Sequence, residues 1–207
     1  MPDDEGIALH LAARRAAALG RGPLVEIGAY RGRSTLYLAA GIAAAAGEAS
    51  SADLPHRSAL LYSVDHHRGS EEMQAGWAHH DPALVDLETG RMDSLRAWRS
   101  SVVRAGADDL VVGVVGDSAR IAEDWATKLS LVFVDGGHGR DVAWADYRGW
   151  SRHLAPGGLL VFHDVFPDPR DGGRPPYECF LDAIASGAFA EEQPASRLSL
   201  RVLRRVS

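Results

Sequence analysis

Short apolar runs alternate with longer amphipathic stretches along most of the chain. Apolar runs bounded by Gly and Pro are typical of buried parallel strands, whereas apolar residues at helical spacing indicate amphipathic helices. Repeated β-then-α units of this kind predict a doubly wound, mostly parallel α/β sheet of the Rossmann-like type. The pattern predicts helices at 6–19, 34–46, 92–105, 118–127, 140–153 and 177–185, and strands at Leu24–Ile27, Ala59–Val64, Leu110–Val115, before Asp135 and before Asp164.

The C-terminal residues predict a different kind of strand. One or two short strands complete the chain, the last at 198–204, where basic and apolar residues alternate. Such alternation suits an exposed edge strand protected by its charges, and an antiparallel edge is common on a parallel sheet. Ala155-Pro156-Gly157-Gly158 is a stop signal after the helix at 140–153.

The chain shows no repeat and no second-domain boundary, so residues 1–207 are expected to form one domain. Two long polar segments, 66–90 and 166–176, follow strands on the side where ligands bind. Long polar loops of this kind are usually lids or binding loops. Trp77 and Tyr177 are the candidates there for stacking on a sugar face, whereas His66, His67, His79 and His80 are expected to be solvated lid residues.

Charge and cysteine content narrow the class of protein. With 22 basic and 28 acidic residues the net charge is −6, which does not favour nucleic acid or an anionic membrane as partner. Cys179 is the sole cysteine, which fits a reducing compartment. Arg14 and Arg15 interrupt the N-terminal apolar stretch, and the apolar run Leu36–Ala46 is too short to span a membrane. We expect a soluble cytoplasmic protein.

Two predicted strands end in a carboxylate with a histidine close by. Residues 131–138 read Leu-Val-Phe-Val-Asp-Gly-Gly-His, and residues 159–164 read Leu-Leu-Val-Phe-His-Asp. Ligands of open α/β sheets bind beyond the carboxyl ends of the strands. If the strands are neighbours, the side chains that meet there can serve a divalent metal or proton transfer. They are Asp135, His138, His163 and Asp164; capping of the loops is the structural alternative for the aspartates and for His138.

The first strand leads into a glycine-bearing turn. Gly28 and Gly32 allow a close backbone approach to a ligand, and Ser34 or Thr35 can cap the following helix. The spacing is G-x-x-x-G, not the G-x-G-x-x-G that holds a pyrophosphate. Glu26, next to the turn, would repel phosphate and favour an amine-bearing ligand.

The next two strand ends supply partners for a nucleoside. Asp65 is placed to accept the hydroxyls of a ribose, and Gly116-Asp117-Ser118 is placed to meet an adenine edge. A ribose and an adenine site without a phosphate cradle point to S-adenosylmethionine.

These segments together resemble class I S-adenosylmethionine-dependent methyltransferases, and more narrowly the small divalent-metal-dependent O-methyltransferases of sugar and natural-product hydroxyls. The resemblance is carried by Glu26–Ser34, Asp65, Gly116–Ser118, Asp135–His138 and Pro156–Asp164, and it covers residues 20–165. It implies a cofactor site for S-adenosylmethionine lined by Glu26, Gly28, Tyr30, Gly32, Ser34, Asp65, Asp117 and Ser118.

The same resemblance implies a metal and a base. It places the ligands of a divalent ion, Mg²⁺ in that branch, at Asp135 and Asp164, and a general base at His138, with Asp135 also counted as catalytic. Related enzymes often carry Glu-Asp where this chain has His163-Asp164. An imidazole softens the site, so either His163 is not a ligand or the metal is not strictly Mg²⁺.

The sequence thus predicts metal-dependent methyl transfer to a hydroxyl of a saccharide, a polysaccharide precursor or a glycosylated natural product. A phenolic or catechol-like hydroxyl is the alternative acceptor, and a non-catalytic adenosyl-ligand-binding module is the alternative of another class. A nicotinamide dehydrogenase is disfavoured by the missing third glycine and by Glu26. The expected partner is a small molecule or oligosaccharide, and a homo-oligomer is compatible with the sequence.

Overall fold

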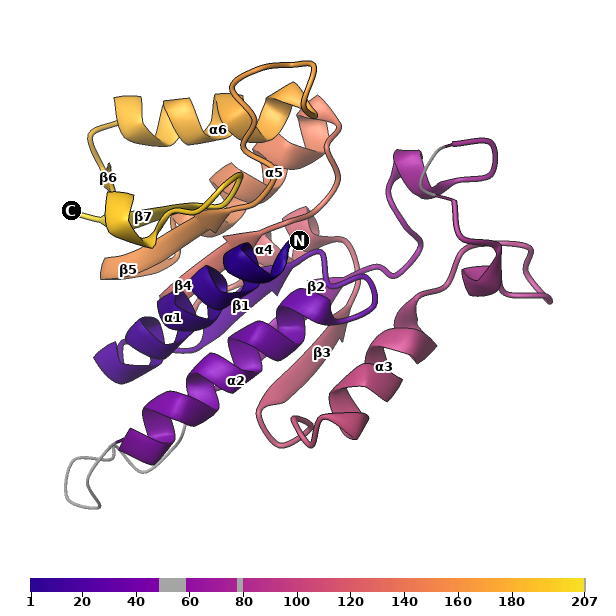
Figure 1. Cartoon of the computed structure of the whole chain (residues 1–207), viewed down its shortest axis with the longest axis horizontal. Coiled ribbons are helices and arrows are strands. Elements are labelled where there is room, and N and C mark those ends of the chain that lie inside the picture. Colours follow the sequence, from indigo (N-terminus) through magenta and orange to yellow (C-terminus); the bar gives the residue numbers. More distant parts are fainter. Residues whose placement is uncertain (49–58, 78–79, 207) are drawn as a thin grey trace.

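The computed structural model describes residues 1–48, 59–77 and 80–206. The described residues form a central sheet with helices on both sides (Figure 1). The helices are α1 (Asp3–Leu19), α2 (Arg33–Glu48), α3 (Leu95–Arg104), α4 (Ser118–Asp124), α5 (Arg140–Ser151) and α6 (Arg174–Ala185). The strands are β1 (Leu24–Ile27), β2 (Leu61–Asp65), β3 (Val111–Val115), β4 (Leu129–Val134), β5 (Leu154–Phe162), β6 (Phe189–Glu191) and β7 (Arg201–Arg205).

Within the described ranges the sheet has seven strands in the order β3-β2-β1-β4-β5-β7-β6. The first five strands of the chain pair in parallel, and β7 and β6 add antiparallel pairs. The prediction of a doubly wound, mostly parallel sheet with an antiparallel C-terminal edge is therefore confirmed. None of the described helices is both long and apolar enough to cross a membrane.

The edge strand itself is β6, and not the strand predicted at 198–204. β7 pairs with β5 on one side and with β6 on the other, so its backbone is not exposed at an edge. The arginines that suggested an edge make local ion pairs instead: Arg204 Nε lies 2.8 Å from Glu192 Oε1. Sequence alternation could not reveal a three-residue strand that adds outside the last one.

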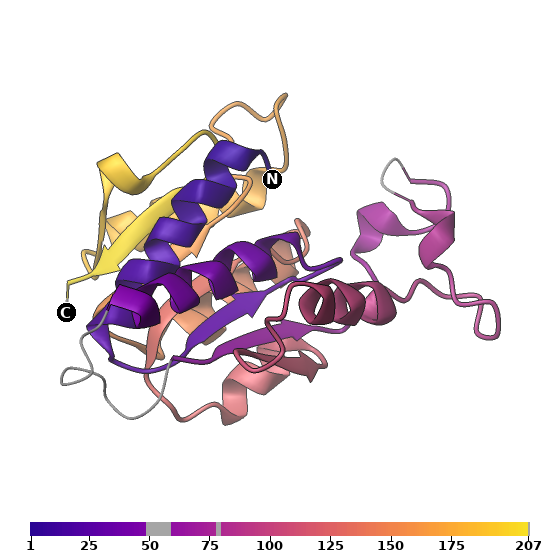
Figure 2. The same cartoon turned by 60° about the horizontal axis from the view of Figure 1, so that its bottom comes forward.

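Helices cover both faces of the sheet (Figure 2), and an apolar cluster fills the space on each face. One face of the strands packs on α1, α2 and α3, and the opposite face packs on α4, α5 and α6. All six residues of β4 are buried, as expected for the central strand of a sheet that is covered on both faces.

Several elements differ from the predicted ones, among them β5, α6 and the segment 66–90. β5 begins at Leu154, so the Pro156-Gly157-Gly158 stop signal lies inside the strand, where the pairing of β4 with β5 shifts register. α6 begins at Arg174, inside the loop predicted at 166–176, because two prolines suit the first turn of a helix. The segment predicted as structureless at 66–90 contains single helical turns at Glu71–Met73 and Pro82–Leu84; His79 lies outside the described residues.

The segment Arg68–Asp93 extends from the layered body in both views (Figures 1 and 2). The chain leaves and returns at a single point, because Ser94 N donates to His67 O at 3.0 Å. The expectation that His67 is solvated was wrong, because its side chain is buried: His67 Nδ1 lies 2.9 Å from Ser94 Oγ, and the ring packs against Trp98 of α3. We call this contact the His67–Ser94 clasp.

The close packing of α1 on α2 depends on Gly41. A Cβ at this position would overlap His10 O and lie 2.8 Å from Ala13 Cβ, whereas a Cβ at Gly47, on the same helix, would have no atom of the described residues within 4 Å.

We expect Gly41→Ala to destabilise the protein by about 1–3 kcal/mol, because the two helices would have to separate. Gly47→Ala is the matched control and should stabilise the protein by about 0.5–1 kcal/mol through helix propensity. Urea unfolding followed by circular dichroism measures both. Equal stabilities of the two variants would contradict the assigned helix packing.

Candidate active site

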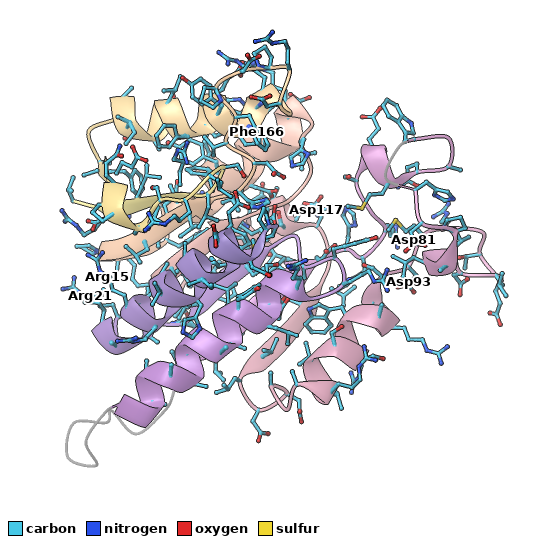
Figure 3. All side chains as sticks on the ribbon, viewed as in Figure 1. Arg15, Arg21, Asp81, Asp93, Asp117 and Phe166 are labelled. Atoms are coloured by element: carbon cyan, nitrogen blue, oxygen red, sulfur yellow. The ribbon has the colours of Figure 1, made fainter. Side chains whose placement is uncertain are left out.

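The carboxyl ends of β1, β2, β4 and β5 lie at one edge of the sheet and bring together most of the predicted site residues. In Figure 3, Asp117 lies at the same end of the body as Phe166 and the segment carrying Asp81 and Asp93, whereas Arg15 and Arg21 lie toward the opposite end. Most of the predicted site residues therefore lie together at the carboxyl ends of the parallel strands, as the sequence analysis expected.

The turn after β1 is held by Asp65 at the end of β2. Asp65 Oδ2 accepts hydrogen bonds from Ala29 N at 2.9 Å and Tyr30 N at 2.8 Å, and its Oδ1 accepts from His67 N at 2.7 Å. A carboxylate has about four acceptor sites, so three are already used by the main chain. Asp65 thus fixes the turn, with room for about one further donor from a ligand.

The two glycines of this turn have different neighbours. Gly28 has φ 86°, and a Cβ there would overlap the main chain of Asp135. The close approach that Gly28 permits is therefore between β1 and the end of β4. Gly32, with φ 93°, lies against Trp98, and Tyr30 between the glycines also has a positive φ of 46°.

Glu26 lies fully buried beneath the turn. Its Oε2 accepts from Thr35 Oγ1 and Ser63 Oγ, each at 2.6 Å, while Oε1 has no hydrogen-bond partner in the described part of the chain. Burial raises the pKa of Glu26 to about 7, although nearby hydroxyl groups favour the ionised form. The suggestion that Ser34 or Thr35 caps α2 was wrong, because the helix begins at Arg33 and the Thr35 hydroxyl donates to Glu26.

Asp117 and Ser118 begin α4. Asp117 Oδ1 caps the helix by accepting from Arg120 N at 3.0 Å, and Ser118 Oγ donates to Asp146 of α5. Asp146 is 3 % exposed, and burial raises its pKa to about 6. The sequence analysis missed Asp146, because a single aspartate inside an amphipathic helix gives no signal of burial.

Asp135, His163 and Asp164 form the candidate metal site. One potential ligand atom from each residue lies within 4.8 Å of the others. His163 Nδ1 is 3.0 Å from Asp135 Oδ1 and 3.2 Å from Asp164 Oδ1. The backbone of Asp164 has φ 55°, in the left-handed region that Asp adopts more readily than most residues other than glycine.

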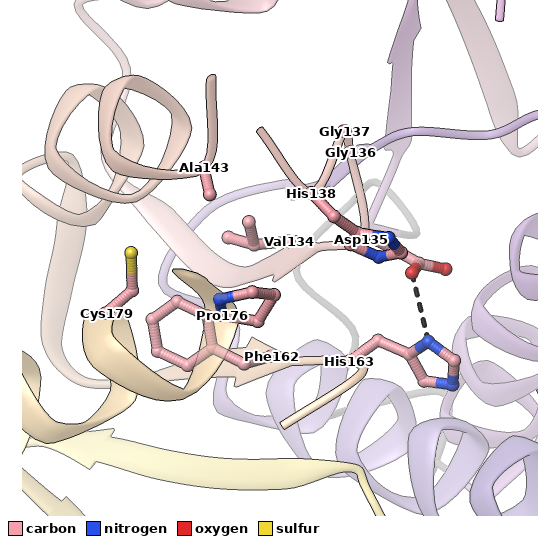
Figure 4. A pocket seen from close by; sticks show the side chains of 10 residues that line it. All are labelled: Val134, Asp135, Gly136, Gly137, His138, Ala143, Phe162, His163, Pro176 and Cys179. Carbon is pink, nitrogen blue, oxygen red and sulfur yellow. Dashed lines mark ion pairs between the residues drawn. The ribbon is translucent and has the colours of Figure 1, made fainter. Parts of the chain in front are cut away.

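His138 completes the cluster from the loop after β4. Its Nε2 lies 3.0 Å from Asp164 Oδ2, an arrangement in which the carboxylate orients the imidazole and stabilises its protonated form. Figure 4 shows the Asp135 carboxylate directed at the His163 ring, with Cys179 and Phe162 farther along the pocket. Burial raises the pKa of the Cys179 thiol to about 12, so this cysteine is not a thiolate nucleophile.

Opposite charges control ionisation in this cluster. Burial disfavours the charged ring of His163, but the close carboxylates of Asp135 and Asp164 outweigh it and raise the pKa to about 11. Burial likewise opposes ionisation of Asp164, yet His138 and His163 hold its pKa well below the usual range. Burial raises the pKa of Asp135, although the close, charged ring of His163 acts to lower it.

The donor set fits a divalent ion. His163 Nδ1 is buried and has no well-directed hydrogen bond within the described residues, although it faces both carboxylates. Two carboxylates and one imidazole suit Mn²⁺, Fe²⁺ or Zn²⁺ as well as Mg²⁺.

The chain is similar to known proteins both in sequence and in fold. Residues 25–165 match the family described as "Methyltransferase domain". Among solved structures, TomG, an O-methyltransferase from Streptomyces achromogenes involved in tomaymycin synthesis, aligns at 16 % identity and TM-score 0.62 over 100 % of this chain and 82 % of its own.

Two further structures are similar. An O-methyltransferase from Bacillus cereus with bound S-adenosylhomocysteine aligns at 16 % identity and TM-score 0.63, over 100 % of this chain and 82 % of its own. A Podospora anserina methyltransferase with the same ligand gives the same identity, TM-score and coverage. At such low identity these structures support the fold.

Asp146 predicts a pH-dependent stability. Between about pH 4 and pH 6 the folded protein retains a proton at Asp146 that the unfolded chain has released, so the contribution of Asp146 to wild-type stability falls as pH rises through this range. Asp146→Asn cannot ionise but keeps an acceptor for Ser118. The stability gained by this variant over wild type should therefore grow from pH 4 to pH 6 and level above, by on the order of 2–3 kcal/mol.

Urea unfolding at a series of pH values measures this difference, with exposed Asp108→Asn as control. A gain that stays constant between pH 4 and pH 7.5 would rule out the raised pKa of Asp146.

Proposed function

The chain belongs to the methyltransferase-domain family, and from this premise we propose that it transfers a methyl group from S-adenosylmethionine to a sugar hydroxyl with the help of a divalent metal. The observation that carries the proposal is the cluster of Asp135, His163 and Asp164 with His138 beside it. The acceptor class comprises saccharides, polysaccharide precursors and glycosylated natural products.

The proposed cofactor site lies under and around the turn after β1. S-adenosylmethionine carries an activated methyl group on a sulfonium sulfur and leaves as a neutral thioether after transfer. The buried, unpartnered Oε1 of Glu26 suits its ammonium group, since a cation would supply the missing donor. The remaining proposed contacts come from Gly28, Tyr30, Gly32, Ser34, Asp65, Asp117 and Ser118.

The chain's own part in the chemistry is to handle a proton. A sugar hydroxyl is a poor nucleophile near neutral pH, and a divalent ion held by Asp135, Asp164 and His163 supplies Lewis-acid activation when bound. His138 accepts the hydroxyl proton as the acceptor oxygen bonds to the methyl carbon. Asp164, at 3.0 Å, keeps the His138 ring in orientation and stabilises its charge.

The segments 66–90 and 166–176 serve as lids in this proposal. The second comes close to the proposed base, since a Cβ added at Gly173 would lie 3.2 Å from His138 Cβ. Trp77, 55 % exposed on the first segment, and Tyr177 at the start of α6 are the proposed platforms for a sugar ring. TomG acts in the synthesis of a natural product, and this supports a natural-product acceptor without bearing on the sugar.

The setting of the reaction follows from composition. A net charge of −6 and a single buried cysteine support a cytoplasmic enzyme, acting as one domain on a small molecule or oligosaccharide and not on nucleic acid.

The metal requirement is tested by transfer of labelled methyl to candidate sugars. We expect chelation to abolish turnover and Mn²⁺ or Mg²⁺ to restore it, and Asp135→Asn and Asp164→Asn to lower kcat/KM by at least about 100-fold. Asp108→Asn is the exposed control and should leave activity unchanged. Full activity in the presence of a chelator would disprove the metal part of the proposal.

The acceptor class is tested with His138→Gln. Base catalysis is worth about 10²–10⁴-fold, so turnover of a sugar should fall by that factor. A phenol, with a pKa of about 10, ionises far more readily, so its turnover should fall much less. If wild type prefers catechols to every sugar, the alternative acceptor is correct. Tight binding of S-adenosylmethionine without transfer to any hydroxyl would indicate a non-catalytic module.

A further inference from the structure

We propose that Glu5, in the first turn of α1, is a positioning residue that directs His163 toward the metal site. This inference rests on the proposed function. Glu5 Oε2 lies 2.9 Å from His163 Nε2, and the two residues are separated by 158 positions in the chain. Glu5 is outside residues 25–165, so the family match does not account for it.

The Glu5 carboxylate is itself held in place. Its other oxygen, Oε1, accepts hydrogen bonds from Ser199 N and Ser199 Oγ, both at 2.7 Å. Glu5 is 1 % exposed. A buried carboxylate is costly unless each oxygen is satisfied, and here one oxygen meets Ser199 and the other meets His163. Glu5 thus links α1 to the end of β5 and to the chain that enters β7, and its position is fixed by both contacts.

The contact assigns a role to each nitrogen of the His163 ring. When Nε2–H donates to a carboxylate, Nδ1 carries the lone pair that a metal requires. Nδ1 is also the ring atom that faces Asp135 and Asp164. Glu5 therefore keeps a proton on Nε2 when a metal replaces the proton on Nδ1, fixes the direction of the ring and increases its basicity as a ligand.

A structural role alone would look different. Glu5 also anchors α1, but so does Glu192, whose Oε2 pairs with Arg15 at 2.8 Å and links the same helix to the C-terminal strands. Loss of either link can loosen α1. Only the loss of the Glu5 link reaches the ring of a candidate metal ligand.

The test is a titration of the metal-free protein with Mn²⁺. Electron paramagnetic resonance of the free ion measures how much Mn²⁺ remains unbound. Glu5→Gln should weaken Mn²⁺ affinity by about 10–100-fold, as for other residues that orient metal-bound histidines. Glu192→Gln is the matched control and should leave the affinity unchanged. Thermal unfolding of each metal-free variant separates loss of affinity from loss of the folded state.

Ser199→Ala provides a second, milder variant, because it removes one donor to Glu5 and keeps the main-chain N–H. It should weaken Mn²⁺ binding by less than Glu5→Gln does, and it decides the matter if Glu5→Gln does not fold. Wild-type affinity in the folded variants would overturn the role of Glu5 and leave the proposed function intact. Absence of Mn²⁺ binding by wild type would overturn both.

Discussion

The ring of His163 lies among three carboxylates, and the arrangement of the candidate site depends on this contact. Glu5 approaches one nitrogen, while Asp135 and Asp164 approach the other. Three buried or half-buried carboxylates would repel one another at close range in a medium of low dielectric constant. One cationic group at their centre, whether the imidazolium or a metal, is what allows β4, β5 and α1 to converge.

Hydrogen bonds to carboxylates also fix the backbone and side chains of the proposed cofactor site. Asp65 uses its carboxylate to hold the turn after β1, and Glu26 uses one oxygen to fix Thr35 and Ser63. Gly28 brings that turn against the main chain of Asp135, so the two halves of the site share one rigid backbone contact. A donor and an acceptor placed on opposite sides of this contact would keep a constant separation, which is a requirement for in-line transfer.

The sequence predicted the sheet and the strand-end residues because both depend on local pattern. Buried parallel strands are continuous apolar runs, and their topology alone brings Asp135 to Asp164. Glu5 and Asp146 could not be predicted, since each looks like an ordinary helix residue and acquires its partner only by tertiary packing. Pro156 and Gly157 led to a wrong prediction of where β5 begins, because a register shift lets turn residues remain in a strand.

The His67–Ser94 clasp affects which insertions and deletions the fold can accept during evolution. The segment between these residues starts and ends at one point of the body, and the entropy of closing a loop grows only slowly with its length. Insertions, deletions or a wholly different segment can therefore be accepted between the two residues without altering the sheet or the strand-end carboxylates. In the proposed function, where this segment serves as a lid, acceptor preference and catalytic chemistry would be encoded in separable stretches of the gene, so that one could drift while the other stays under selection.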